Sequence, residues 1–258
     1  SQPNIVLFLI DDLGWKDVGC YGSDYYKTPN IDRLAAQGVR FTNGYAACAV
    51  CSPTRAAILT GKYPARLMLT EWLPSGRWNP KAKLRSGRFL RALPLEEITL
   101  AEALRKGGYR TLHIGKWHLG GPPFSLPVQH GFDVNVGGSE HGAPGHYFYP
   151  YMGNWKIPTT NERVQKITLP NGKEGEYLTD RLTSEALALV EQDHEKPFFL
   201  HFSHYAVHTP FQAKDNITKK YEKIPEAKRQ GKPIYAAMVQ SVDESVGRVM
   251  DALKKLKK

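Results

Sequence analysis

The chain has 258 residues, of which 41% are hydrophobic and 23% charged, a composition that fits a globular protein and excludes a disordered one. Its 35 Lys and Arg outnumber 25 Asp and Glu, and the formal charge of +10 favours anionic partners such as sulfated sugar, acidic lipid or nucleic acid. No apolar run approaches the roughly 20 residues of a membrane-spanning helix, so we expect no membrane span. Three cysteines are too few for a disulfide framework.

The first predicted element is a strand from Asn4 to Ile10, a continuous apolar run typical of a buried central strand. Two adjacent acids, Asp11 and Asp12, follow it directly. The residues before the strand lack the basic and apolar regions of a signal peptide, so the start is expected to be a mature or trimmed terminus.

The next predicted elements are a helix at 28–38, a strand at 39–45 and a helix at 52–60. The first helix begins with Thr-Pro and the second with Ser-Pro, and each is ended by Gly, which are the usual start and stop signals.

Further along, Thr99 and Glu102 form a capping box for a helix to about Lys106. Strands are expected at 109–114 and 198–202, with a helix at 179–192 between them. The segment 120–161 is rich in Gly, Pro and aromatic residues and is predicted to be a long ordered loop region. The most periodic element is the last helix, whose apolar stripe predicts packing in the core.

Alternating strands and helices predict an α/β fold, with a mostly parallel central sheet and helices on both faces, in one domain spanning 1–258. Polar residues follow three of the predicted strands. Because ligands bind beyond the carboxyl ends of strands in such sheets, these residues are expected to share one edge. They are Asp11 and Asp12, Lys116 and His118, and His204 and His208.

Adjacent carboxylates are costly to bury unless a cation neutralises them. Asp11 and Asp12 therefore indicate a site for Ca²⁺ or Mg²⁺, although a turn cap beside a solvent-facing acid would give the same pattern.

The segment from Cys51 to Arg55 places a cysteine at a helix N-terminus, where the helix dipole favours an anion. Arg55 lies one helical turn further on and can point back toward it. The pattern is consistent with a thiolate of lowered pKa or with a buried cysteine beside a capped helix. Cys48 and Cys51 also form a lone C-x-x-C, which leaves open a redox pair or half a zinc site.

With these motifs in this order, the sequence resembles the type I sulfatases, the formylglycine-dependent members of the alkaline phosphatase-like superfamily. The resemblance spans essentially the whole chain. It is carried by Asp11-Asp12, Cys51-Ser52-Pro53-Thr54-Arg55, Leu59-Thr60-Gly61-Lys62, Gly115-Lys116-Trp117-His118-Leu119-Gly120 and His208-Thr209-Pro210.

The resemblance implies that a formylglycine-generating maturation enzyme oxidises Cys51 to formylglycine, whose hydrated aldehyde attacks sulfur and forms a sulfated intermediate that then expels sulfate. Asp11, Asp12 and the residue made from Cys51 would bind the metal, which is usually calcium and less often magnesium.

The same resemblance assigns roles to the remaining motif residues. Arg55 and His118 would orient the nucleophile, Lys116 would neutralise sulfate oxygens, and His208 would contact the sulfate and protonate the leaving alcohol. It also implies export to the periplasm, the cell exterior or the lysosome.

The sequence departs from the family pattern near its end. A later strand with further metal ligands, a substrate-binding lysine and the C-terminal subdomain are not found, so we expect a truncated chain that binds metal weakly. Asp215-Asn216 is rejected as a substitute because no apolar strand precedes it.

The substrate class is indicated by a basic segment, 62–91, with eight basic residues against Glu71 alone and with interleaved aromatic residues. It is either a wall of a polyanion-binding cleft, favouring sulfated carbohydrate, or a solvated loop. Two other functions stay open: a phosphonate monoester or phosphodiester hydrolase with the same nucleophile, and a non-enzymatic polyanion binder. No nucleic-acid-binding module accompanies the charge.

Weaker candidates lie outside the motifs. His204 is a candidate substrate contact. His141, His146 and the tyrosines between Tyr147 and Tyr151 are candidates for a sugar subsite or for surface packing. Asn216 begins a glycosylation acceptor pattern.

Overall fold

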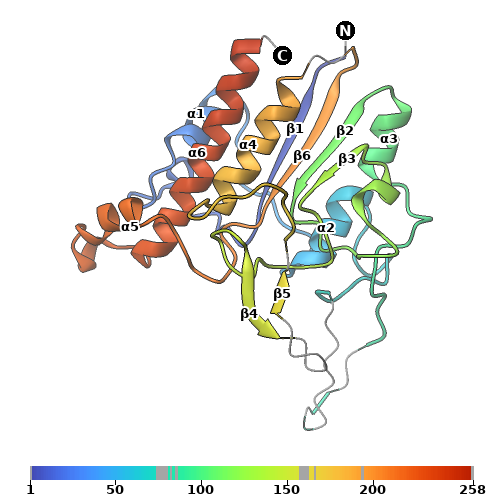
Figure 1. Ribbon diagram of the computed structural model, residues 1–258, viewed down its shortest axis with the longest axis horizontal. Coiled ribbons are helices and arrows are strands. Elements are labelled where there is room, and N and C mark those ends of the chain that lie inside the picture. The colour runs from blue at the N-terminus through green and yellow to red at the C-terminus, as the bar shows by residue number, and fades with distance from the viewer. Residues whose placement is uncertain are drawn as a thin grey trace.

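A parallel four-stranded sheet forms the centre of the molecule (Figure 1). The computed structural model describes residues 2–73, 81, 83–84, 87–156, 163–165, 167–192 and 195–256. The strand order is β1 (Ile5–Ile10), β6 (Phe198–His204), β2 (Arg110–Gly115) and β3 (Val134–Val136), and all three pairings are parallel. A separate antiparallel pair joins β4 (Met152–Lys156) to β5 (Arg163–Gln165). The predicted α/β class with a mostly parallel sheet is confirmed.

Helices cover both faces of the sheet, as predicted. In Figure 1, α1 (Pro29–Gln37), α4 (Leu178–Val190) and α6 (Pro233–Leu256) lie to one side of the strands. On the other side lie α2 (Cys51–Thr60) and α3 (Leu100–Lys106). The short α5 (Asp215–Glu222) packs against α6. Single 3-10 turns occur at Gly19–Tyr21, Pro127–His130 and Glu226–Lys228.

Alternation along the buried strands explains this two-sided core, because successive side chains of a strand point to opposite faces. On β6, Leu200 and Phe202 belong to the cluster that includes α4 and α6. Phe199 belongs to the second cluster, with Ala56 and Leu59 of α2. Each such large apolar side chain contributes roughly 1.5–3 kcal/mol when fully buried.

The predicted capping box and core stripe are both present. Thr99 Oγ1 accepts from the Glu102 amide at 3.2 Å, and the Thr99 amide donates to Glu102 Oε2 at 2.8 Å. This reciprocal pairing satisfies two amides that the helix itself leaves free. On α6 the stripe is buried against the sheet side of the molecule through Met238, Val239, Val242, Val246 and Val249.

The predicted strand at 39–45 is wrong. Val39, Phe41 and Tyr45 are 80%, 73% and 88% exposed, and the segment has no regular structure. A strand needs a hydrogen-bonding neighbour and a face to bury, and no strand among the described residues pairs with this segment. Its alternating apolar pattern is therefore not sufficient for a strand here.

The start of α2 also differs from the prediction. Val50, not Ser52, is the N-cap, and Cys51 is the first helical residue. The Ser52 hydroxyl instead accepts from the amide of Leu73 at 3.1 Å. Ser52 thus bonds α2 to Leu73, within the basic segment 62–91.

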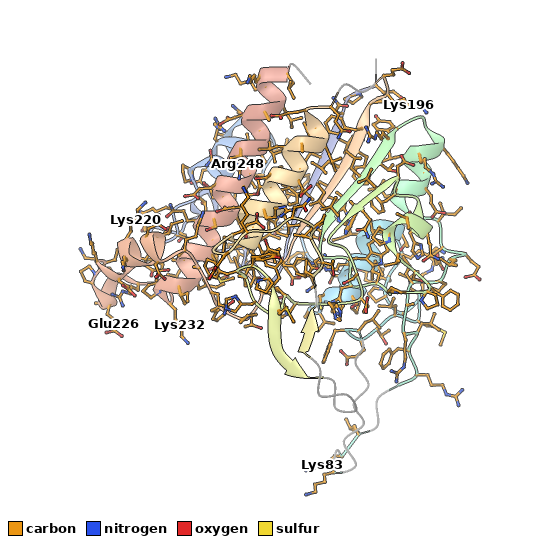
Figure 2. The ribbon with its side chains drawn as sticks, viewed as in Figure 1. Lys83, Lys196, Lys220, Glu226, Lys232 and Arg248 are labelled. Carbon is orange, nitrogen blue, oxygen red and sulfur yellow. The ribbon has the colours of Figure 1, made fainter. Side chains whose placement is uncertain are left out.

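The segment 120–161 is more structured than the predicted loop, because β3, β4 and a 3-10 turn lie within its described part. In the basic segment, residues 74–80, 82, 85 and 86 lie outside the described residues, so the proposed wall including Arg77, Trp78 and Arg85 is not described. Lys83 lies far from the sheet (Figure 2). Among the described helices, none has the length and hydropathy needed to span a bilayer.

Candidate functional site

The carboxyl ends of three neighbouring strands lie side by side. Ile10 of β1 pairs with His204 of β6, and Gly115 of β2 pairs with Ser203. Asp11 and Lys116, each directly after one of these strand ends, are therefore brought to the same edge. The expectation that polar residues from separate segments meet here holds for this pair.

Asp11 lies at the centre of a buried ion network. Its side chain is 5% exposed; Oδ1 accepts from Arg55 Nη2 at 2.8 Å and Oδ2 accepts from Lys116 Nζ. Burial by itself would raise the pKa of Asp11, but the two cations outweigh it and hold the pKa below its usual value. Asp11 is therefore a carboxylate at neutral pH.

Ser203 joins the two cations, and sequence reasoning missed it. Arg55 Nη1 donates to the Lys116 carbonyl at 2.9 Å and to the Ser203 hydroxyl, while the Ser203 carbonyl accepts from the Lys116 amide at 2.7 Å. Its position could have indicated it, because Ser203 lies at the carboxyl end of a buried strand and directly precedes His204, which was a candidate from the sequence.

Asp12 has the opposite environment. Its side chain is 62% exposed, and its backbone lies in the left-handed region with φ of 58°. Its Oδ2 lies 3.7 Å from Nε2 of His208. Ligand atoms of Asp11, Asp12 and His208 all lie within 4.8 Å of one another, close enough to share a cation. The sequence pointed to the two acids but assigned His208 to the substrate.

A turn after β6 places His208 beside these acids. The Asp11 amide donates to the Ala206 carbonyl at 3.1 Å, and the Val207 amide donates back to the Asp11 carbonyl at 2.8 Å. The turn closes through a bond of 3.1 Å from the His208 amide to the Tyr205 carbonyl. The backbone of the first acid is thus bonded directly to the turn that carries the imidazole.

Cys51 opens onto the same site. It lines a cavity of about 580 Å³ together with Asp11, Asp12 and Arg55. As the first residue of α2 it belongs to the turn whose amides have no intrahelical acceptor, which favours negative charge beside it. Its thiol lies outside the group of metal-ligating atoms that contains the two acids.

The surroundings of the buried Lys116 affect its pKa in both directions. Lys116 is fully buried, and burial followed by the charge of Arg55 lowers its pKa, while Asp11 and Cys51 act in the opposite direction. Lys116 is joined to the cavity through Asp11, which pairs with it and lines the cavity beside Cys51.

Cys48 and Cys51 form no disulfide and belong to no group of close metal-ligating atoms among the described residues. Cys20, Cys48 and Cys51 are all free thiols. The single group of close metal-ligating atoms found among the described residues includes no cysteine. Cys48 does line the cavity beside Cys51.

His118 is buried, 2% exposed, with its Nε2 against the Leu73 carbonyl. Burial, assisted by the Lys116 charge, lowers the pKa of His118 to about 3, so its ring is neutral at physiological pH. Its other nitrogen, Nδ1, is buried with no hydrogen-bond partner among the described residues. His118 and Ser52 thus both bond to the backbone of Leu73, His118 at the carbonyl and Ser52 at the amide.

The weaker candidates do not converge on the cavity. His204 is buried in the core, with Nε2 2.9 Å from the Ser245 hydroxyl, so its expected substrate contact is wrong. Tyr147 and Tyr151 are fully buried, which excludes them as exposed sugar platforms. His141 and His146 are partly exposed and do not line this cavity.

Comparison with known proteins gives a consistent result. A family model described as Sulfatase matches residues 3–258. N-acetylgalactosamine-6-sulfatase of Mus musculus is 35% identical over 270 residues, covering 99% of this chain and 48% of that protein. Steryl-sulfatase of Homo sapiens is 31% identical over 333 residues, covering 100% of this chain and 52% of that protein.

A solved structure matches over the same extent. The crystal structure of Ps i-CgsB in complex with k-i-k-neocarrahexaose superposes with a TM-score of 0.78 at 33% identity, covering 99% of this chain and 55% of that one. The chain spans about half the length of the curated relatives it matches. Since the family model matches nearly every residue and its motifs meet at one edge of the sheet, the chain belongs to the sulfatase family.

Proposed function

We propose that this protein hydrolyses sulfate esters, using a nucleophile made from Cys51. The observation that carries the proposal is the shared cavity: Cys51, Asp11, Asp12 and Arg55 line one space at the carboxyl edge of a parallel sheet. Once a formylglycine-generating enzyme has oxidised Cys51, the hydrated aldehyde supplies the oxygen that attacks sulfur.

The acids fit a hard divalent cation. Oxygen atoms of Asp11 and Asp12 are the ligand type that Ca²⁺ and Mg²⁺ prefer, and they lie close enough to share an ion. We propose that both acids hold calcium together with the residue made from Cys51, and that magnesium binds less well. The ion would supply positive charge that stabilises the attacking oxygen. Since calcium takes about six to eight oxygens, these residues provide only part of its coordination.

The chain's own cations stabilise the transferred group. Sulfate transfer concentrates negative charge on the sulfate and leaving oxygens, so fixed positive charges beside the cavity lower the barrier. Asp11 pairs with both Arg55 and Lys116, while the Ser203 hydroxyl accepts from Arg55 and the Ser203 carbonyl accepts from the Lys116 amide. We assign sulfate binding to Lys116, orientation of the nucleophile to Arg55 and His118, and protonation of the leaving alcohol to His208.

We infer that the substrate is a sulfated carbohydrate. One relative is named for N-acetylgalactosamine and one similar structure holds k-i-k-neocarrahexaose. The net charge of +10 favours a polyanion. In the described part of the basic segment, however, Lys62 already pairs with Glu97 at 2.5 Å, so it offers less charge to a substrate than the sequence suggested. The export implied by the family resemblance remains a prediction.

Turnover of matched esters tests the reaction class. The protein is produced together with a formylglycine-generating enzyme, and hydrolysis of the sulfate and phosphate esters of one phenol is compared. We expect the sulfate to be cleaved faster and Cys51→Ala to abolish the activity. Faster cleavage of the phosphate would favour the alternative of a phosphonate monoester or phosphodiester hydrolase. Equal rates of sulfate release by the wild type and by Cys51→Ala would exclude this nucleophile.

A second assay tests the substrate class. Sulfate release from sulfated galactosamine and from carrageenan oligosaccharides is measured against release from the aryl sulfate. Turnover of the aryl sulfate alone, with every sulfated sugar inert, would contradict the carbohydrate assignment while leaving the sulfatase activity intact.

A further inference from the structure

Tyr147 has its hydroxyl on the turn that carries His208. The hydroxyl lies 2.9 Å from the Tyr205 carbonyl and 2.8 Å from the His208 carbonyl. The Tyr205 carbonyl also accepts the His208 amide at 3.1 Å, so the phenol bridges both ends of this one turn.

The opposite side of the turn is bonded to the first metal-site acid. Ala206 and Val207, the two middle residues, exchange backbone hydrogen bonds with Asp11 at 3.1 and 2.8 Å. The turn is therefore held between Asp11 on one side and Tyr147 on the other. Movement of the turn at its Tyr147 side would change the distance of 3.7 Å between His208 Nε2 and Asp12 Oδ2.

Tyr147 is itself rigidly placed. It is fully buried, its amide donates to Gln212 Oε1 at 2.8 Å, and its carbonyl accepts from the Leu178 amide at 2.7 Å. Its ring stacks on Tyr177 with centroids 5.8 Å apart. Burial raises the pKa of the Tyr147 phenol well above its usual value, so the hydroxyl remains a donor at any working pH.

We propose that Tyr147 is a positioning residue that fixes the His208 imidazole against Asp11 and Asp12, rather than part of a sugar-binding surface. The proposal rests on the function proposed above for His208. Tyr147 does not line the cavity; it acts through the two carbonyls of the turn.

The test uses two matched phenylalanine variants. Tyr147→Phe removes the bridging hydroxyl and keeps the ring. Tyr177→Phe removes an equally buried hydroxyl that donates to the Gln212 carbonyl at 2.8 Å, without touching the turn. On an aryl sulfate we expect Tyr147→Phe to lower kcat about ten-fold with little change in KM, less than the roughly hundred-fold or larger loss expected for His208→Gln. Tyr177→Phe should retain wild-type kcat.

A readout independent of turnover separates this proposal from the proposed function. The ring resonances of His208 are recorded by NMR and assigned from the His208→Gln spectrum. We expect Tyr147→Phe to shift or broaden them, and Tyr177→Phe to leave them unchanged, at equal thermal stability of the two variants. Equal kcat and equal His208 resonances in both variants would overturn the assignment. If the wild type cleaves no sulfate ester, the proposed function fails while the NMR comparison still decides the role of Tyr147.

Discussion

The two acids that follow β1 are neighbours in sequence and opposites in environment. Asp11 is buried and bonded to Arg55 and Lys116, and its backbone is bonded to the turn after β6. Asp12 has a largely exposed side chain, and its Oδ2 lies 3.7 Å from Nε2 of His208. Both acids line the cavity, but Asp11 is buried and paired with two cations, whereas the side chain of Asp12 is largely exposed.

Because of this difference, we expect Asp11 to contribute to the stability of the fold and Asp12 to contribute mainly to metal binding. Removing a partner from a buried ion network leaves an uncompensated charge, whereas removing an exposed acid leaves nothing unpaired. We therefore expect substitutions of Asp11 to affect stability and function together, and substitutions of Asp12 to affect metal binding with little effect on stability.

The largest expected effect is that of Asp11→Asn. It leaves Arg55 and Lys116 buried with less negative charge between them, and we expect the free energy of unfolding to fall by about 3–5 kcal/mol. Urea denaturation measures it. A loss below about 1 kcal/mol, a value typical of an exposed pair, would show that the ion network is not buried in solution.

Calcium should stabilise the folded protein by a smaller amount. Binding to the folded state alone adds about 2.7 kcal/mol at a calcium concentration 100-fold above the dissociation constant. The melting temperature is measured with calcium, with magnesium and with chelator. We expect Asp12→Asn to remove the calcium effect; an identical calcium shift in that variant would place the ion elsewhere.

The pH dependence of stability should show the contribution of the Asp11 carboxylate when the wild type is compared with Asp11→Asn. Because the folded pKa of Asp11 lies below its unfolded value of 3.8, its carboxylate stabilises the protein above pH 3.8, and this contribution is lost as the pH falls through the folded pKa. The difference in unfolding free energy between wild type and Asp11→Asn should thus shrink on acidification below pH 3.8. A difference that grows toward acid pH would mean that the pKa is raised instead.

The smallest expected effect is that of Asp12→Asn on stability without calcium. An exposed side chain away from packing usually changes the unfolding free energy by no more than about 0.5 kcal/mol. Denaturation in chelator checks this. A loss as large as that of Asp11→Asn would remove the distinction between the two acids.

Local sequence signals were sufficient for most of the fold. The continuous apolar run of β1 and the capping box of α3 each determine their structure with little help from distant residues. The segment at 39–45 has a strand pattern but no strand beside it, and pairing is a tertiary property that the pattern does not contain. The strand β3 has only three residues, too few for any periodicity to be visible.

The site was predictable where motifs specify residue identity, as for Asp11, Asp12, Cys51 and Arg55, which line one cavity. Roles that depend on three-dimensional contacts were not. The Ser203 hydroxyl bonds Arg55 and the Tyr147 hydroxyl bonds the Tyr205 carbonyl. Both partners lie far away in the chain, and nothing in the neighbouring sequence indicates them. The expected metal contact of Cys51 stays a prediction.

The mass of the peptide containing Cys51 tests the central claim most directly. The protein is produced together with a formylglycine-generating enzyme and digested, and the peptide is examined by mass spectrometry. The account predicts an aldehyde in place of the thiol at Cys51, and none in a Cys51→Ala control. A peptide that keeps its unmodified thiol under these conditions would contradict the proposed nucleophile.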